Sequence, residues 1–177
     1  LRDARRDRRR GAQQDGASSL GRLGPEPLDK RFTVGCFAGM LKARQRQIKP
    51  LLLDQTFIAG LGNIYVDEAL WESKIHPCRT AASLTEPEIR ALYRAIPRVL
   101  KRGLKNLGTS LGTGKANFYS IARHQGRNRD KLNVFRRTDR PCPRCLTKIQ
   151  RITVGRRSTH ICPSCQVQGS EVQGKRL

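Results

Sequence analysis

Near its C-terminus the chain reads Cys142-Pro-Arg-Cys145 and, after sixteen further residues, Cys162-Pro-Ser-Cys165. Two Cys-x-x-Cys pairs at this separation bring four thiolates within reach of one tetrahedral ion, which is the pattern of a structural zinc site. The alternatives are disulfides or a redox pair, and His160 could replace one cysteine ligand. We expect a single structural Zn²⁺ bound by Cys142, Cys145, Cys162 and Cys165.

The residues between the cysteine pairs predict a β-hairpin. Arg151-Ile-Thr-Val154 and Ser158-Thr-His-Ile161 are short runs with β-forming residues, and Gly155-Arg156-Arg157 separates them as the turn. The zinc site would hold the base of this hairpin together. Two arginines would then stand at its tip.

Upstream of the cysteines the chain predicts helices. The clearest covers residues 84–103, where Thr85-Glu86-Pro87-Glu88 has the pattern of a capping box. Pro97 removes one backbone hydrogen bond and predicts a kink, at a cost of about 3 kcal/mol if nothing relieves it. The apolar residues of this segment fall on one helical face, namely Ile89, Leu92, Tyr93, Ile96, Val99 and Leu100.

Two further helices are expected, at residues 64–73 and 34–43. Trp71, Phe37 and the run Leu51-Leu52-Leu53 are interpreted as core residues rather than site residues.

Four other side chains are given structural roles. Asp67 and Glu68 are interpreted as partners of a helix dipole, and Cys36 and Cys78 as small buried residues. No G-x-S-x-G motif or P-loop is present, and the three histidines are scattered along the sequence.

The charge balance indicates an anionic partner. The chain has 36 Lys and Arg against 14 Asp and Glu, a formal net charge of 36 − 14 = +22. Such a field favours a polyanion through counterion release, with nucleic acid ahead of a membrane surface. The longest apolar runs are too short to span a bilayer, and no signal-peptide pattern is present. We expect a monomer in the cytoplasm whose partner is nucleic acid.

The two ends of the chain predict little folded structure. Residues 1–24 are rich in Arg, Asp, Gly, Gln and Ser, and are interpreted as a disordered or remnant segment. Gly24-Pro25-Glu26-Pro27 predicts a rigid linker at the first domain boundary. The polar stretch from Gln166, with residues 167–177 as the tail, is expected to fray.

The segment around Gly60-Leu-Gly62-Asn63 predicts an anion site. Glycines at 60 and 62 permit a tight turn, and Asn63 would be the N-cap of the helix that follows, where free amides and the helix dipole attract anions. Asn63 could equally do no more than cap its own helix, and Lys49 could be an ordinary solvated lysine.

Three stretches resemble the formamidopyrimidine-DNA glycosylase family. The run from Ile48 to Glu68, followed by Ile75-His76-Pro77, resembles its helix–two-turn–helix, Leu23–Leu28 its linker, and Pro141–Cys165 its zinc finger. The resemblance covers residues 23–166 in the family's order. It implies a mainly α fold with a small zinc-pinned β-hairpin, divided into a helix–two-turn–helix domain at residues 25–116 and a zinc-finger region at 117–166.

The family excises oxidised bases such as 8-oxoguanine and formamidopyrimidines from DNA and then cuts the abasic strand. By resemblance, Lys49 and Asn63 would hold the phosphates beside the flipped nucleotide. Arg157 would grip the same phosphates and assist strand cleavage, a task suited to a guanidinium. Arg44 and Arg46 would line the same DNA face. The family usually has glycine where this chain has Arg156.

The family's nucleophile is an N-terminal proline amine with a glutamate beside it. The sequence given contains neither, so we expect it to be the C-terminal part of such an enzyme and not to excise 8-oxoguanine by itself. Asp7-Arg-Arg-Arg-Gly11 is either a trace of the family's Asp-x-Arg-Arg-Phe-Gly loop or a solvated basic arm. The alternative function is a truncated, inactive module that binds damaged DNA.

Overall fold

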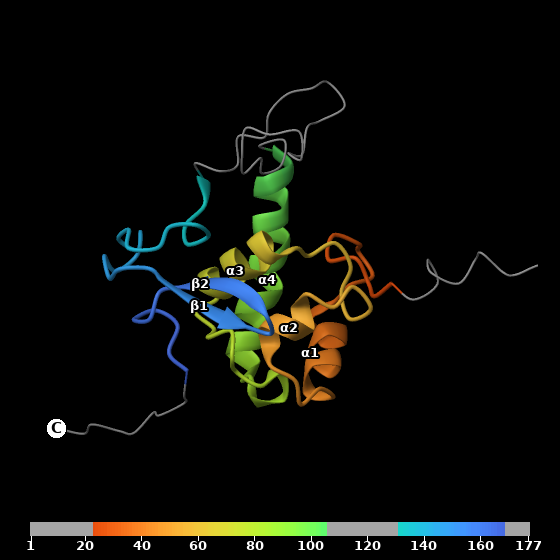
Figure 1. The fold of residues 1–177 in the computed structure, drawn as a ribbon. Coiled ribbons are helices and arrows are strands. Elements are labelled where there is room, and N and C mark those ends of the chain that lie inside the picture. Colours follow the sequence, from red (N-terminus) through yellow and green to blue (C-terminus); the bar gives the residue numbers. More distant parts are fainter. Residues whose placement is uncertain (1–22, 106–130, 169–177) are drawn as a thin grey trace, which may run out of the picture.

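The structure is a computed structural model that describes residues 23–105 and 131–168. The predicted N-terminal arm up to residue 22, including the Asp7–Gly11 motif, and the predicted tail from residue 169 lie outside the described residues. The described elements are α1 (Val34–Lys42), α2 (Ile48–Leu52), α3 (Asn63–Glu72), a short 3₁₀ helix η2 (Ala81–Ser83), α4 (Glu86–Lys105), β1 (Gln150–Val154) and β2 (Arg157–Ile161), as Figure 1 shows. This confirms the predicted fold class.

One apolar core lies where α4 packs against α3 and α1. Ile89, Leu92 and Ile96 of α4 have no exposed surface, and Phe37 of α1 is buried in the same core, which confirms its predicted place there. The core residues of α4 recur at helical spacing, which explains why this face is buried while Arg90, Arg94 and Arg98 of α4 are exposed. None of the described helices is both long and apolar enough to cross a membrane.

The N-terminus of α4 forms only part of the predicted capping box. Glu88 reaches back as expected, and its Oε2 accepts from the Thr85 amide at 2.7 Å. The Thr85 hydroxyl donates to the same oxygen at 3.0 Å, and Arg79 donates to Oε1 at 2.9 Å. The hydroxyl therefore binds the carboxylate instead of accepting from a free amide. Pro97 lies inside α4, which is a single element to its end.

The hairpin turn is tighter than the sequence indicated. Val154 pairs with Arg157, so the loop contains only Gly155 and Arg156. Both have positive φ, 55° and 62°, as a type I′ turn requires. The prediction that Arg157 belongs to the turn is therefore wrong: it is the first residue of β2, where strand pairing fixes its backbone.

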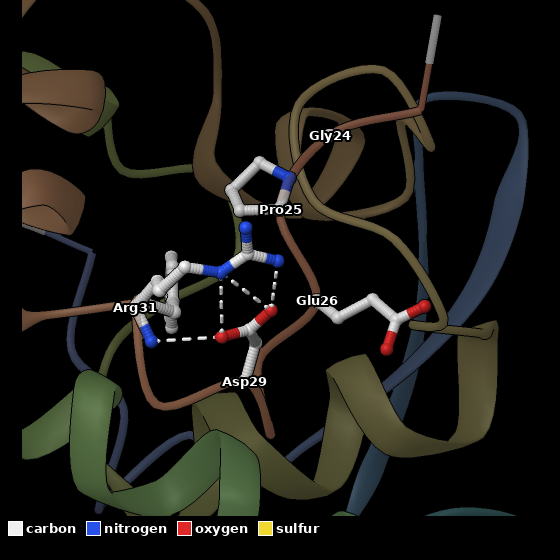
Figure 2. Close-up of a pocket in the computed structure, with 6 residues that line it drawn as sticks. Gly24, Pro25, Glu26, Asp29 and Arg31 are labelled. Atoms are coloured by element: carbon white, nitrogen blue, oxygen red, sulfur yellow. Dashed lines mark hydrogen bonds and ion pairs between the residues drawn. The ribbon is translucent and has the colours of Figure 1, made fainter. Parts of the chain in front are cut away.

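The predicted linker is packed onto the loop before α3. The Gly24 amide donates to the Gln55 carbonyl at 2.8 Å, and the Ala59 amide donates to the Pro25 carbonyl at 3.1 Å. A Cβ on Gly24 would lie 2.5 Å from the Phe57 carbonyl carbon, so a larger residue would force the backbones apart. Figure 2 shows the pocket beside this segment, in which the Asp29 carboxylate pairs with the Arg31 guanidinium.

The start of α3 differs from the prediction by one residue. Gly62 is the N-cap and Asn63 is the first helical residue, so the Asn63 side chain is free for a contact outside its own helix. Gly60 has the expected positive φ, 81°, but Gly62 has an ordinary extended backbone with φ −102°. Cys36 was also misassigned, because it is exposed on α1 rather than buried.

Candidate metal centre and nucleic-acid interface

The four predicted zinc ligands meet at the base of the hairpin. Their Sγ atoms all lie within 4.8 Å of one another, and the Sγ–Sγ distance is 3.4 Å for Cys145–Cys162 and 4.0 Å for Cys142–Cys165. Sulfurs at about 2.3 Å from a tetrahedral Zn²⁺ are about 3.8 Å apart, so the cluster fits this ion. The prediction of one structural zinc site is confirmed, and His160 is not needed as a ligand.

Helix α3 contacts the zinc ligands directly. Trp71 is buried, and its indole Nε1 donates to the Cys142 sulfur at 3.4 Å. The Arg144 guanidinium lies 4.2 Å from the centroid of the Trp71 ring and donates to the Trp71 carbonyl at 3.1 Å. A donor to a ligating thiolate orients it and lowers its charge density. Trp71 is a core residue, as predicted, and also joins the helical domain to the metal centre.

Glu68 and Gln166 fasten the zinc-finger region to the helices. The buried Glu68 carboxylate accepts from the amides of Asn133, Val134 and Phe135 at 2.8–3.0 Å. Its predicted role as a dipole partner is wrong, since it lies in the second turn of α3 and binds a separate loop. Gln166 is also buried and bonds Cys162 and the Ile75 carbonyl, so the frayed tail cannot begin there.

The tip of the hairpin lies against α2 and the start of α3 (Figure 1). A Cβ on Gly155 would lie 2.8 Å from Cγ of Pro50, so only glycine allows this approach. The Ser158 carbonyl accepts two bonds, from Asn63 Nδ2 at 3.0 Å and from Lys49 Nζ at 3.1 Å. Helices α2 and α3 therefore both contact the distant hairpin at the residue after Arg157.

Lys49 is not a solvated lysine. Its side chain and that of Asp67 have no exposed surface, and Nζ lies 2.5 Å from Asp67 Oδ1. Burial lowers the pKa of the Lys49 ammonium below its ordinary value, and the Asp67 carboxylate opposes this shift. Asp67 Oδ2 accepts from the His160 amide at 2.9 Å and lies 3.3 Å from Nδ1 of its ring. The predicted dipole role of Asp67 is therefore wrong.

The three predicted arginines differ in their surroundings. Arg157 is exposed at the start of β2, and no hydrogen bond of its guanidinium occurs within the described ranges. Arg46 pairs with Asp54 at 2.8 Å, and Thr56 and Arg46 together hold the pKa of Asp54 down to about 2. Arg44 is exposed, and its guanidinium donates a long bond of 3.4 Å to the carbonyl of its neighbour Ala43.

The structure thus brings Asn63, Lys49 and Arg157 to one place, and it joins neither Arg44 nor Arg46 to them through any contact between described residues. Sequence reasoning missed Asp67 as an interior partner. The apolar neighbours Val66, Ala69 and Leu70 indicated that this part of the helix is buried, but they did not indicate which group the Asp67 carboxylate would bind.

Two family models match the chain. The formamidopyrimidine-DNA glycosylase H2TH domain matches residues 23–114, and the zinc finger found in FPG and IleRS matches residues 140–167. The formamidopyrimidine-DNA glycosylase of Protochlamydia amoebophila is 50% identical over 147 residues, which cover 83% of this chain and 53% of the relative. The chain spans about half the length of the curated relatives that it matches.

Solved structures agree with the sequence relatives. The complex of Lactococcus lactis Fpg with DNA containing an abasic site aligns with a TM-score of 0.77 at 40% identity, over 84% of this chain and 53% of that one. The MutM (Fpg) protein of Thermus thermophilus aligns with a TM-score of 0.79 at 42% identity, over 85% of this chain and 56% of that one. With its helix–two-turn–helix and its four-cysteine finger both matched, this chain belongs to the formamidopyrimidine-DNA glycosylase family.

Proposed function

We propose that this chain is the DNA-binding part of a DNA glycosylase/AP lyase that removes oxidised purines during base excision repair. The observation that carries the proposal is the convergence of Asn63 and the exposed Arg157 on the hairpin tip, in a protein of net charge +22. Its relatives include a Lactococcus lactis Fpg solved in complex with DNA containing an abasic site. We propose damaged duplex DNA as the partner, and a cytoplasmic location beside the chromosome.

Asn63 and Arg157 are suited to hold the backbone of a distorted duplex. One N–H of the Asn63 amide is bonded to Ser158, and an amide nitrogen carries two, so a second donor is available for a phosphate oxygen. The first turn of α3 adds free backbone amides and the positive end of its dipole. Arg157 would approach the same phosphate from β2 with a planar, bidentate donor.

Rotating a nucleotide out of the stack requires its flanking phosphates to be held close together, and two donors on separate rigid elements can do this. The zinc centre and the α3 contacts keep the hairpin rigid enough for the task. We propose that Arg44 and Arg46 extend the basic surface along the duplex without contacting the flipped nucleotide, since both are exposed in the loop between α1 and α2.

The test is fluorescence anisotropy on three duplexes of one sequence: undamaged, with 8-oxoguanine, and with a tetrahydrofuran abasic analogue. Tighter binding to the abasic analogue than to the undamaged duplex is expected. Equal affinity for all three would refute recognition of damage. Borohydride trapping on a preformed abasic site separates the enzyme from a module that binds damage without chemistry, because only an enzyme amine joined to the sugar is trapped.

A further inference from the structure

The Lys49 ammonium lies in the protein interior, where it cannot contact a DNA phosphate. Its ammonium has no exposed surface, and its two partners are the Asp67 carboxylate at 2.5 Å and the Ser158 carbonyl at 3.1 Å. To reach a phosphate in solvent, the ammonium would have to leave a buried carboxylate without its counter-charge, which is strongly unfavourable in a protein interior. Its side chain instead points from α2 toward the backbone of β2.

Asp67 connects the same elements from the other side. One carboxylate oxygen accepts from Lys49, and the other accepts from the His160 amide of β2 at 2.9 Å. The edge of the His160 ring packs against Phe135 with 4.9 Å between ring centroids. A single carboxylate on α3 thus fixes a lysine of α2 and the middle of β2, so neither can shift without breaking a buried contact.

The Ser158 carbonyl is the point at which this network meets the proposed DNA contacts. It accepts from Lys49 Nζ at 3.1 Å and from Asn63 Nδ2 at 3.0 Å. Ser158 is the residue directly after Arg157, so these two bonds set the direction in which β2 leaves the turn. The Oδ1 atom of Asn63 is buried and has no partner within the described residues, so the amide orientation depends on the Ser158 bond.

We propose that Lys49 and Asp67 are positioning residues, which hold the Ser158 carbonyl and thereby aim Arg157 and Asn63 at the DNA, and that Lys49 makes no phosphate contact of its own. The inference rests on the proposed function, namely that this face binds DNA. It assigns the phosphate contacts to Asn63 and Arg157, and it gives Lys49 a role inside the protein.

The decisive variant is the double substitution Lys49→Met/Asp67→Asn. It removes the buried pair without leaving a lone charge, keeps an acceptor for the His160 amide, and leaves the net charge of the chain unchanged. Any loss of affinity therefore cannot come from a weaker overall field. Arg94→Met is the control for losing one cation far from the hairpin, because it removes an exposed cation from the outer face of α4.

Two measurements distinguish positioning from direct contact. Affinity for the abasic-analogue duplex should fall about tenfold or more in the double variant. Adding Arg157→Ala should cause little further loss, because both changes remove the same contact. Salt dependence is measured as the slope of the logarithm of the binding constant against the logarithm of salt concentration. In the Arg157→Ala background this slope should be the same with and without Lys49, whereas losing a direct phosphate contact would reduce its magnitude by about 0.9. Additive losses with a lower slope would show that Lys49 binds phosphate directly.

Amide hydrogen exchange over residues 153–160 tests the positioning without DNA. Faster exchange in the double variant, with zinc content unchanged, is the expected result, and Arg94→Met should exchange like the parent protein. Unchanged exchange together with unchanged affinity would overturn the inference. If the parent protein shows no preference for damaged DNA, the proposed function fails, while hydrogen exchange still decides whether the pair holds the hairpin.

Discussion

The indole Nε1 of Trp71 donates to the Cys142 sulfur at 3.4 Å, so α3 reaches a ligand of the proposed zinc ion. The same residue lies under the Arg144 guanidinium and packs with Val134, Ile149 and Cys162. The metal centre and the helical domain therefore share one buried side chain. Loss of the metal would therefore alter the packing of α3 as well as that of the hairpin.

Chelation should unfold the hairpin first and change the environment of Trp71. Zinc binding supplies much of the folding free energy of small finger domains, and the ligands must be thiolates. Trp71 is the one tryptophan of the chain, so its emission reports this site alone. We expect one zinc per chain by elemental analysis, and a red-shifted emission on adding a strong chelator. Protein purified without chelators that contains no zinc would contradict the assignment.

The two turn residues should respond in opposite ways to substitution. Arg156 has φ 62°, a conformation that costs a non-glycine residue about 1 kcal/mol, so Arg156→Gly should leave stability unchanged or raise it by up to about 1 kcal/mol. Gly155→Ala combines φ 55° with a Cβ only 2.8 Å from Pro50 and should lower stability by about 1–3 kcal/mol. Thermal unfolding of the two variants measures both stability changes. Equal losses would mean that the turn is not of the type described.

Glu88 should make the N-terminus of α4 sensitive to acid. Burial opposes its ionised form, but the Thr85 amide, Arg79 and the Thr85 hydroxyl outweigh this and hold the pKa of Glu88 below its ordinary value of 4.5. A lowered folded pKa means that the stabilisation is fully present above about pH 4.5 and is lost as pH falls through the folded value. Glu88→Gln should therefore cost about 1 kcal/mol at pH 7 and less at pH 3.

Urea unfolding of Glu88→Gln at the two pH values measures this difference, with Glu86→Gln as the control. Glu86 is exposed in the same helical turn, so its replacement should have a smaller effect at both pH values. A loss of stability in Glu88→Gln that is the same at pH 3 and pH 7 would show that the carboxylate charge is not responsible.

The zinc ligands and the long helix could be predicted because their signals are local. Spacing alone places Cys142 and Cys145 on one knuckle, and periodicity alone identifies the buried face of α4. Asp67 and Glu68 could not be assigned in this way. The backbone amides that donate to them lie 93 and 65–67 residues away, and nothing near an acid on a helix shows whether a distant backbone will donate to it.

The role of Lys49 illustrates the same limit. A lysine before Pro50 suggests a solvated cation or a phosphate contact, and both interpretations treat it as a surface residue. Lys49 is instead buried where the hairpin docks, with the Asp67 carboxylate and the Ser158 carbonyl at its ammonium and Gly155 against Pro50. The prediction of the turn length was wrong for a related reason. Arg156 adopts a left-handed conformation that is unfavourable for its residue type, so sequence preferences do not predict it.

Arg157→Ala should weaken binding to a duplex with an abasic analogue by about 1–3 kcal/mol, the range for a lost charge-assisted contact. Since the guanidinium is exposed and has no bonded partner within the described ranges, its removal leaves no buried group unsatisfied and should not change stability. The loss should be larger than that of Arg94→Ala, which removes the same charge from the outer face of α4. Anisotropy titrations at several salt concentrations should also show a slope reduced by about 0.9 for one phosphate contact. If Arg157→Ala and Arg94→Ala weaken binding equally, the chain holds DNA through its overall charge, and the hairpin tip has no special part in recognition.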